Sequence, residues 1–192
     1  GKFELVPTVF DLHAMVRGVA ETFSFPAGTK GVRMEVEIGD GLPSLVRADQ
    51  VRLRQILYNL VGNAVKFTHE GEIRIILALL GRRNGLARVE LRVRDTGIGI
   101  PKDQQPGLFQ PFVQASSAGS VRGSGTGLGL SIVKRIAGFM GGDVELSSEP
   151  GRGTTVIVRV EVELGGDLPK EDPDCAARQA CCRLSTGGLR IL

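Results

Sequence analysis

The chain has few of the residues that build disulfide frameworks, zinc sites or nucleic-acid surfaces. Its 192 residues include 3 cysteines, 2 histidines and no tryptophan, and only 5% are aromatic. The cysteines, Cys175, Cys181 and Cys182, all lie near the C-terminal end without neighbouring histidines. Their odd number and position argue against a disulfide framework or a zinc cluster. We therefore expect a reducing, cytoplasmic setting.

Strong charge of one sign and long hydrophobic runs are also missing. The formal net charge is +3, and the basic residues are scattered without aromatic partners, so we expect no nucleic-acid partner. No apolar run approaches the ~18 residues that span a bilayer. The first residues lack a signal-peptide pattern. What remains, with 42% hydrophobic residues, is enough to bury a core, and we expect a monomeric chain.

Hydrophobic spacing divides the chain into a patterned part and a tail. Residues 1–165 are expected to form one domain, whereas the Gly, Asp, Pro and Lys content of the rest is typical of a linker, so residues 166–192 are expected to be a linker or tail. Apolar residues recur at helical spacing in three segments, expected as helices at 12–25, 49–67 and 128–140. Alternation predicts strands at 32–38, 72–80, 87–95, 143–147 and 154–164.

Punctuating residues sharpen these boundaries. Pro26 is expected to end the first helix, and Gly141 with Gly142 to stop the third. A turn at residues 81–85 predicts a hairpin between two of the strands. Because few strand-helix-strand crossovers occur, we expect an α+β fold in which helices cover one face of a mixed, mainly antiparallel sheet.

Two glycine clusters interrupt the pattern, at residues 95–100 (DTGIGI) and 125–130 (GTGLGL). A lone Gly-x-Gly mostly marks a turn, but the second cluster opens a predicted helix. Backbone N–H groups at a helix start are free to meet an anion, and the helix dipole adds to the attraction. The clusters therefore predict a phosphate-bearing ligand.

A polar stripe on the second predicted helix supports a nucleotide site. Gln55, Asn59, Asn63 and Lys66 share one side of the helix and include no carboxylate. A solvated helix face would normally pair Glu with Lys, which this stripe does not. An ordinary solvated face nevertheless stays open as the alternative. Amide oxygens can ligate a hard cation such as Mg²⁺ that is shared with phosphates, and a lysine can meet the phosphates directly.

Strand parity places two polar residues on an apolar face. Asp95 has the parity of the apolar residues before it, and a buried carboxylate needs a hydrogen-bond donor such as an adenine amino group. Gly97 and Gly99 would let the backbone approach the ring. Thr154 also faces inward and could join a water-bridged contact to the base. The alternatives are that Asp95 only caps a turn and that Thr154 is an ordinary strand residue.

Four segments together resemble the catalytic ATP-binding domain of sensor histidine kinases, within the superfamily of gyrase, MutL and heat-shock-chaperone ATPases. Residues 55–68 (QILYNLVGNAVKFT) are similar to its N box and residues 109–114 (FQPFVQ) to its F box. Residues 95–99 and 125–129 resemble its two glycine boxes. The four motifs occur in family order across residues 1–165, which makes the resemblance specific.

The resemblance implies a Bergerat-type two-layer α/β sandwich that binds ATP and Mg²⁺. It implies Asn63 as the Mg²⁺ ligand, Lys66 on a phosphate and Asp95 on the adenine amino group. It also implies a mobile lid at residues 114–124, from which Arg122 could reach the phosphates or simply remain an exposed charge. Further nucleotide contacts are implied at Phe109, Phe112, Gly125, Thr126, Gly127, Leu128 and Gly129.

Asn59 separates two activities within the resembling superfamily. Hydrolysing members carry a glutamate there to activate water, whereas this chain has an amide, which cannot accept a proton usefully near neutral pH. We therefore expect slow hydrolysis and favoured γ-phosphoryl transfer to a presented nucleophile. The alternatives are a non-catalytic nucleotide-binding or docking module and an ATP-hydrolysing relative.

The phosphoacceptor of the family is a histidine on a dimerisation hairpin, and neither His13 nor His69 has such a neighbourhood. We expect the hairpin elsewhere in a longer parent protein. The resemblance is compatible with a parent protein that is anchored in the inner membrane. The opening residues 1–5 resemble the strand that follows the hairpin. The last residues, 189–192 (LRIL), resemble the first strand of a response-regulator receiver domain, or are an incidental apolar end. Pro106 should interrupt the short helix expected before the F box.

Overall fold

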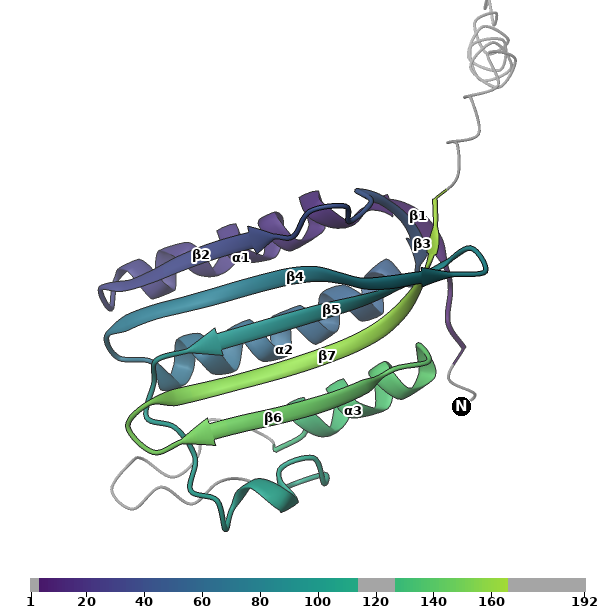
Figure 1. Cartoon of the computed structure of the whole chain (residues 1–192). Helices are drawn as coiled ribbons and strands as arrows, with labels where there is room; N and C mark the ends of the chain where they lie inside the picture. Colours follow the sequence, from purple (N-terminus) through teal and green to yellow (C-terminus); the bar gives the residue numbers. More distant parts are fainter. Residues whose placement is uncertain (1–3, 114–126, 166–192) are drawn as a thin grey trace, which may run out of the picture.

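Three helices lie together behind one sheet in the computed structural model, which describes residues 4–113 and 127–165 (Figure 1). The helices are α1 (Leu12–Gly28), α2 (Gln50–Phe67) and α3 (Gly129–Phe139). All three cover the same face, and the other face of the sheet is uncovered in this view. The two-layer α+β architecture predicted from the sequence is confirmed.

The sheet has seven strands, and most of its pairs are antiparallel. Its order is β1-β3-β7-β5-β4-β2, with β6 pairing β7, and only the β2–β4 pair is parallel. The β5–β7 pairing places Asp95 opposite Thr154 at one end of the sheet. The strands are β1 (Thr8–Asp11), β2 (Val32–Ile38), β3 (Leu45–Ala48), β4 (Gly71–Arg83), β5 (Leu86–Asp95), β6 (Asp143–Glu149) and β7 (Gly153–Leu164).

The core fills the space between the sheet and the helices. Ile56 and Leu57 of α2 are fully buried, as are Ile73 and Ile75 of β4. Burying an aliphatic side chain of this size contributes about 1.5–3 kcal/mol. The Asp49 carboxylate caps α2 by accepting from the backbone N–H of residue 52 at 3.0 Å. The cap therefore fixes where α2 begins, and its apolar side fixes which helix face turns away from the core.

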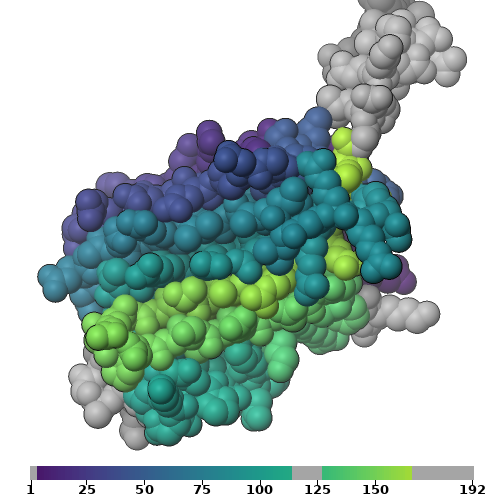
Figure 2. Space-filling model, viewed as in Figure 1, coloured from purple at the N-terminus to yellow at the C-terminus, as the bar shows by residue number. Residues whose placement is uncertain are grey.

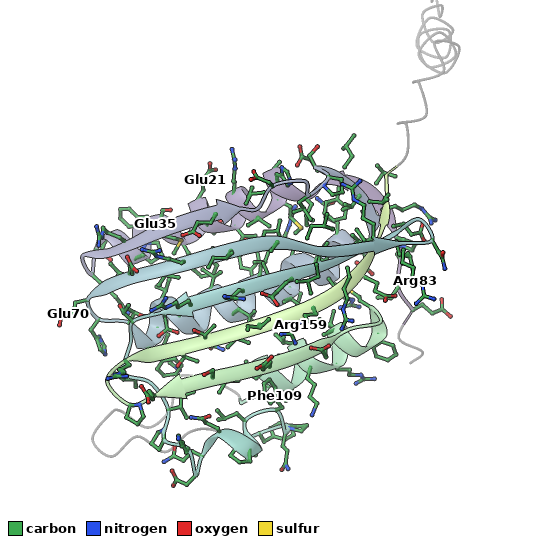
Figure 3. All side chains as sticks on the ribbon, in the orientation of Figure 1. Glu21, Glu35, Glu70, Arg83, Phe109 and Arg159 are labelled. Atoms are coloured by element: carbon green, nitrogen blue, oxygen red, sulfur yellow. The ribbon has the colours of Figure 1, made fainter. Side chains whose placement is uncertain are left out.

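The sheet face that no helix covers is turned toward the viewer in Figure 2. This face carries charged side chains, with Arg159 near its middle (Figure 3). The Arg159 guanidinium lies 3.2 Å from Glu90, 2.9 Å from Asp143 and 3.0 Å from Glu145. Arg74 forms a similar centre on β4, 2.9 Å from a carboxylate of the same strand. Glu90 is buried, whereas Asp143 and Glu145 are exposed. Ion pairs with exposed carboxylates contribute at most about 1 kcal/mol each. Their main consequence here is a hydrated face that needs no second helical layer.

The prediction that α1 ends before Pro26 is wrong, because the helix continues to Gly28. Proline removes one backbone donor, but here it lies in the last turn, and the carbonyl left without it belongs to the exposed residue Thr22. Ala27 is completely buried in the core, and the Thr29 N–H donates to the Phe25 carbonyl at 3.0 Å. Tertiary burial of the last turn therefore outweighs the missing hydrogen bond.

Short strands and strand ends account for the other differences. The four-residue strands β1 and β3 pair with each other and were not predicted. Of the opening residues 1–5, which resemble a strand, residues 4 and 5 form none, and residues 1–3 lie outside the described ranges. The β4–β5 turn is limited to Asn84 and Gly85, both with positive φ, and not the whole segment 81–85. Within the described ranges, no helix is long and apolar enough to cross a membrane.

Candidate functional site

Asp95 ends β5 with its side chain directed toward the helix layer. The residue is only 8% exposed, as the parity of the strand predicts. Its Oδ1 accepts hydrogen bonds from the backbone N–H groups of Gly97, at 2.9 Å, and Thr154, at 3.2 Å. Within the described residues, Oδ2 receives no hydrogen bond. The carboxylate therefore caps the turn with one oxygen and keeps the other for a further donor.

Burial raises the pKa of the Asp95 carboxyl above its ordinary value, and the two backbone hydrogen bonds only partly oppose this effect. The charged form is thus held in a place that disfavours it. A ligand N–H group that donates to Oδ2 would stabilise the carboxylate.

Glycine is required where the chain passes close to its neighbours after Asp95. A Cβ at Gly97 would collide with the Phe67 carbonyl at the end of α2, and a Cβ at Gly99 would collide with the Glu149 carbonyl at the end of β6. Gly99 also has a φ of 67°, in the left-handed region. The glycines of the first cluster therefore allow this loop to pack tightly between the ends of α2 and β6.

The polar stripe of α2 meets the start of α3. A Cβ at Gly129 would lie 3.3 Å from Asn59 Oδ1 and 3.8 Å from Asn63 Nδ2, so the glycine gives both amides room. The Asn59 amide donates to the Gln55 carbonyl at 2.9 Å, which turns its oxygen toward α3. The Asn63 amide has no hydrogen-bond partner among the described residues. Gln55 is engaged elsewhere, because its Oε1 accepts from Arg52 at 2.9 Å.

The C-terminal end of α2 is capped by a lysine from outside the predicted motifs. Lys30 Nζ donates to the carbonyl of Val65 at 2.6 Å and to that of Lys66 at 3.4 Å. The Lys66 ammonium lies 4.8 Å from the centre of the Phe67 ring. Lys30 is separated from α2 by two strands, β2 and β3, so no helical pattern could have predicted this contact.

The F box joins the second glycine cluster through the backbone. The Phe112 N–H donates to the Gly127 carbonyl at 3.1 Å, although the Phe112 side chain is 77% exposed and its φ is 66°. Phe109 is half-buried in the segment after β5, with Lys134 of α3 5.7 Å from its ring (Figure 3). Before it, Pro106 leaves only one 3₁₀ turn, η1 (Gln105–Gly107), as its position in the sequence predicts.

The second glycine cluster opens α3 without a side-chain cap from the described residues. Leu128 is the N-cap residue, and Gly127 before it has a φ of 69°. The first N–H groups of α3 are thus available to an anion. Predictions for Gly125, Thr126, Arg122 and the lid at 114–124 lie outside the described residues, and so do those for the tail at 166–192.

A polar clamp that the sequence did not predict joins the first glycine loop to the β6–β7 turn. Ser148 Oγ contacts the Ile100 N–H at 2.8 Å, the Gly153 carbonyl at 2.9 Å and Thr154 Oγ1 at 2.9 Å. Gln105 Nε2 donates to the carbonyls of Ile100, at 2.8 Å, and Ser148, at 2.9 Å. The predicted strand stopped at residue 147. Extending its alternation by one residue would have placed Ser148 on the inward face.

A hollow of about 350 Å³ also borders Asp95 and Thr154. Its other walls include Arg92, Arg94 and Thr155, which belong to the uncovered face of the sheet. The polar ends of α2 and α3 lie on the helix side instead. We therefore place the candidate site on the helix side of Asp95 and not in this hollow.

Comparison with known proteins decides which family has this arrangement. Residues 48–164, from the end of β3 to the end of β7, match the family described as histidine kinase-, DNA gyrase B- and HSP90-like ATPase. The chain belongs to this family. The matched span contains all of the described candidate residues and includes the N box, the F box and both glycine boxes.

Among curated proteins, relatives of this ATPase domain are sensor kinases. The chain is 38% identical over 173 residues to the signal transduction histidine-protein kinase BarA of Escherichia coli strain K12, covering 90% of the chain and 19% of that protein. It is 39% identical to the virulence sensor protein BvgS of Bordetella bronchiseptica, covering 100% of the chain and 16% of that protein. The chain thus spans about a fifth of the length of these relatives.

Solved structures place the domain in the same fold. Full-length ShkA in complex with AMPPNP aligns with a TM-score of 0.74 and 35% identity, covering 87% of this chain and 33% of that one. The catalytic domain of the histidine kinase ThkA aligns with a TM-score of 0.62 and 28% identity, covering 83% of this chain and 98% of that one.

Proposed function

We propose that the chain is the catalytic domain of a protein-histidine kinase, which binds ATP with Mg²⁺ and passes the γ-phosphoryl group to a histidine on a dimerisation hairpin outside this chain. The observation that carries the proposal is the buried Asp95 carboxylate, on the same side of the sheet as the Asn63 amide and the start of α3. Among the described residues, none donates to its Oδ2 and no side chain caps α3. The family and the AMPPNP bound to the similar ShkA support it.

The part of the site around Asp95 and Thr154 would hold the base, and we call it the base end. Here Asp95 accepts a hydrogen bond from the adenine amino group. Gly97 and Gly99 bring the backbone close to the ring without a Cβ, and Thr154 adds its hydroxyl beside the carboxylate. Such a contact is made only by a base with a donor at this position. The base end therefore selects the nucleotide.

At the phosphate end, the Asn63 amide oxygen ligates Mg²⁺ and Lys66 meets a phosphate as a point charge. Asn63 fits this role because its amide has no other partner within the described residues and lies beside the start of α3. The bound ion would neutralise phosphate charge. The N–H groups at the start of α3, including that of Gly129, hold the same phosphates. We further propose that Arg122 and the lid complete this end.

Asn59 favours transfer over hydrolysis. Its amide nitrogen donates to the Gln55 carbonyl, and its oxygen cannot accept a proton usefully near neutral pH. Phosphoryl transfer then depends on an incoming nucleophile held in line with the leaving group. A histidine presented on a separate hairpin satisfies this requirement without a base at Asn59.

Neither histidine of the chain is suited to be that nucleophile. His13 is half-buried in α1, and His69 lies in the turn between α2 and β4. Both are fixed to the body of the domain. We therefore propose the hairpin as the partner, a receiver domain as the later acceptor, and residues 166–192 as a linker toward it.

Asn63→Ala is expected to weaken ATP binding mainly when Mg²⁺ is present, because the lost amide oxygen matters only when the ion is there. Calorimetric titrations with and without Mg²⁺ measure the difference. Arg54→Ala, an exposed change on the same helix, is the matched control and should alter neither titration. Equal weakening by Asn63→Ala in both conditions would remove this residue from the metal site.

The chain alone is expected to bind ATP without becoming phosphorylated on histidine, and to label a supplied hairpin in trans. Incubation with γ-labelled ATP, followed by acid and base treatment, identifies acid-labile phosphohistidine. A hairpin whose histidine is replaced by glutamine is the control and should stay unlabelled.

Labelling of the isolated chain at His13 or His69 would contradict the expected transfer in trans. Binding of ATP with no labelling of any supplied hairpin would favour the non-catalytic alternative. Steady release of phosphate by the chain alone would instead favour the hydrolysing one.

A further inference from the structure

Ser148 has three hydrogen-bond contacts with one hydroxyl group, and this number restricts where its proton can be. The Ile100 N–H can only donate to Ser148 Oγ, at 2.8 Å. The Gly153 carbonyl can only accept from it, at 2.9 Å. The third contact, with Thr154 Oγ1 at 2.9 Å, is between two hydroxyls, either of which can donate.

Only one arrangement of protons satisfies all three contacts. A serine hydroxyl has one proton and two lone pairs. Its proton is used by the Gly153 carbonyl, and one lone pair is used by the Ile100 N–H. The second lone pair must then accept the Thr154 proton. As a result, Thr154 Oγ1 has no proton left and faces the base end as an acceptor only.

We propose that Ser148 is a specificity-determining residue, which makes the base end favour a purine with a 6-amino group over one with a 6-oxo group by holding Thr154 as an acceptor. This inference rests on the proposed function, since it assumes that a purine nucleotide is bound beside Asp95. Ser148 is buried and acts through Thr154 without contacting the base itself.

The chemistry of the neighbouring carboxylate points the same way. Asp95 Oδ2 is an acceptor when ionised, and Oδ1 is already used by two backbone donors. An amino group, directly or through a water, can donate to these acceptors. A 6-oxo group would bring another acceptor against them. Without Ser148, Thr154 could rotate its proton toward the oxo group and relieve this conflict.

The test compares adenosine diphosphate with inosine diphosphate by calorimetry with Mg²⁺. The inosine base has a 6-oxo group in place of the 6-amino group and an N1–H donor in place of the N1 acceptor. The wild-type chain should prefer adenosine diphosphate by about tenfold or more. Ser148→Ala should reduce this preference by about two- to tenfold, the range of one neutral hydrogen bond. The matched control, Ser147→Ala, changes the adjacent exposed serine and should leave the preference unchanged.

A double-mutant cycle separates specificity from structure. Thr154→Val should also reduce the preference for adenosine diphosphate over inosine diphosphate. Adding Ser148→Ala to Thr154→Val should reduce this preference no further. A purely structural role of Ser148 predicts that both nucleotides weaken in parallel with an unchanged ratio, and that result would overturn the proposal. If Ser148→Ala does not fold, Ser148→Cys serves instead, because a thiol is a weaker acceptor. It should reduce the ratio of the affinities for adenosine diphosphate and inosine diphosphate. An unchanged ratio would contradict the proposal equally. Failure of the wild-type chain to bind either nucleotide would instead contradict the proposed function.

Discussion

Asp95→Asn is expected to weaken ATP binding by roughly ten- to 150-fold, corresponding to about 1.5–3 kcal/mol. One amide oxygen can still accept from the N–H groups of Gly97 and Thr154. The amide nitrogen then takes the place of Oδ2 and points its protons at the adenine amino group, so that two donors face each other. Calorimetry with ATP in Mg²⁺ measures the loss.

The fold should survive the substitution, because asparagine has nearly the same shape and carries no buried charge. Its free energy of unfolding should stay within about 1 kcal/mol of the wild-type value near neutral pH. Circular dichroism and urea unfolding provide this check. Unchanged affinity of a folded Asp95→Asn variant would remove Asp95 from the base site.

The pH dependence of stability and of ATP affinity, compared between the wild type and Asp95→Asn, isolates the effect of the Asp95 charge. Burial raises the pKa of Asp95, so the folded chain binds a proton at this group more readily than the unfolded chain does. Its contribution to stability therefore falls as pH rises through the raised pKa, which lies above the ordinary value of about 3.9. ATP binding needs the carboxylate, so the affinity ratio of wild type to Asp95→Asn should fall as pH is lowered. Taking the ratio cancels the titration of the nucleotide itself.

Regular periodicity predicted the elements that hold the candidate site. The amide stripe and the apolar side of α2 could be read from spacing alone because this helix buries one face and is capped by Asp49. The alternation of β5 likewise predicted that Asp95 faces inward. Both predictions depend on local geometry, which the sequence determines directly.

Features that depend on distant neighbours could not be predicted in the same way. The strands β1 and β3 are too short for a pattern and are defined by pairing with each other. Pro26 stays helical because Ala27 is buried beneath it. Lys30 and Ser148 act through contacts with segments far away in the sequence. Their roles follow from tertiary packing, which no single window of residues contains.

The first glycine loop combines both kinds of feature. Its glycines could be recognised from the local sequence, but their role is to let the loop backbone pass close to a distant segment of the chain. Gly99 holds a left-handed φ and lies against the Glu149 carbonyl, while the Gly151 N–H donates to the Ile98 carbonyl at 2.8 Å. The loop is thereby fixed to the β6–β7 turn. Any displacement of this loop would move Asp95 relative to Thr154.

Gly99→Ala is therefore expected to abolish measurable ATP binding and to lower the free energy of unfolding by about 2 kcal/mol or more. The new Cβ would collide with a backbone oxygen, which cannot rotate away as a flexible side chain could, and alanine disfavours the positive φ. Calorimetry and urea unfolding measure the two effects.

The same substitution in α3, Gly138→Ala, is the matched control. Gly138 is exposed, and a Cβ there meets nothing within 4 Å. Alanine is the better helix former, so this variant should gain about 0.5–1 kcal/mol and bind ATP as the wild type does. If Gly99→Ala instead behaved like Gly138→Ala, the loop would have to tolerate a shift of its backbone, and the tight fit proposed to hold Asp95 against the base would be wrong.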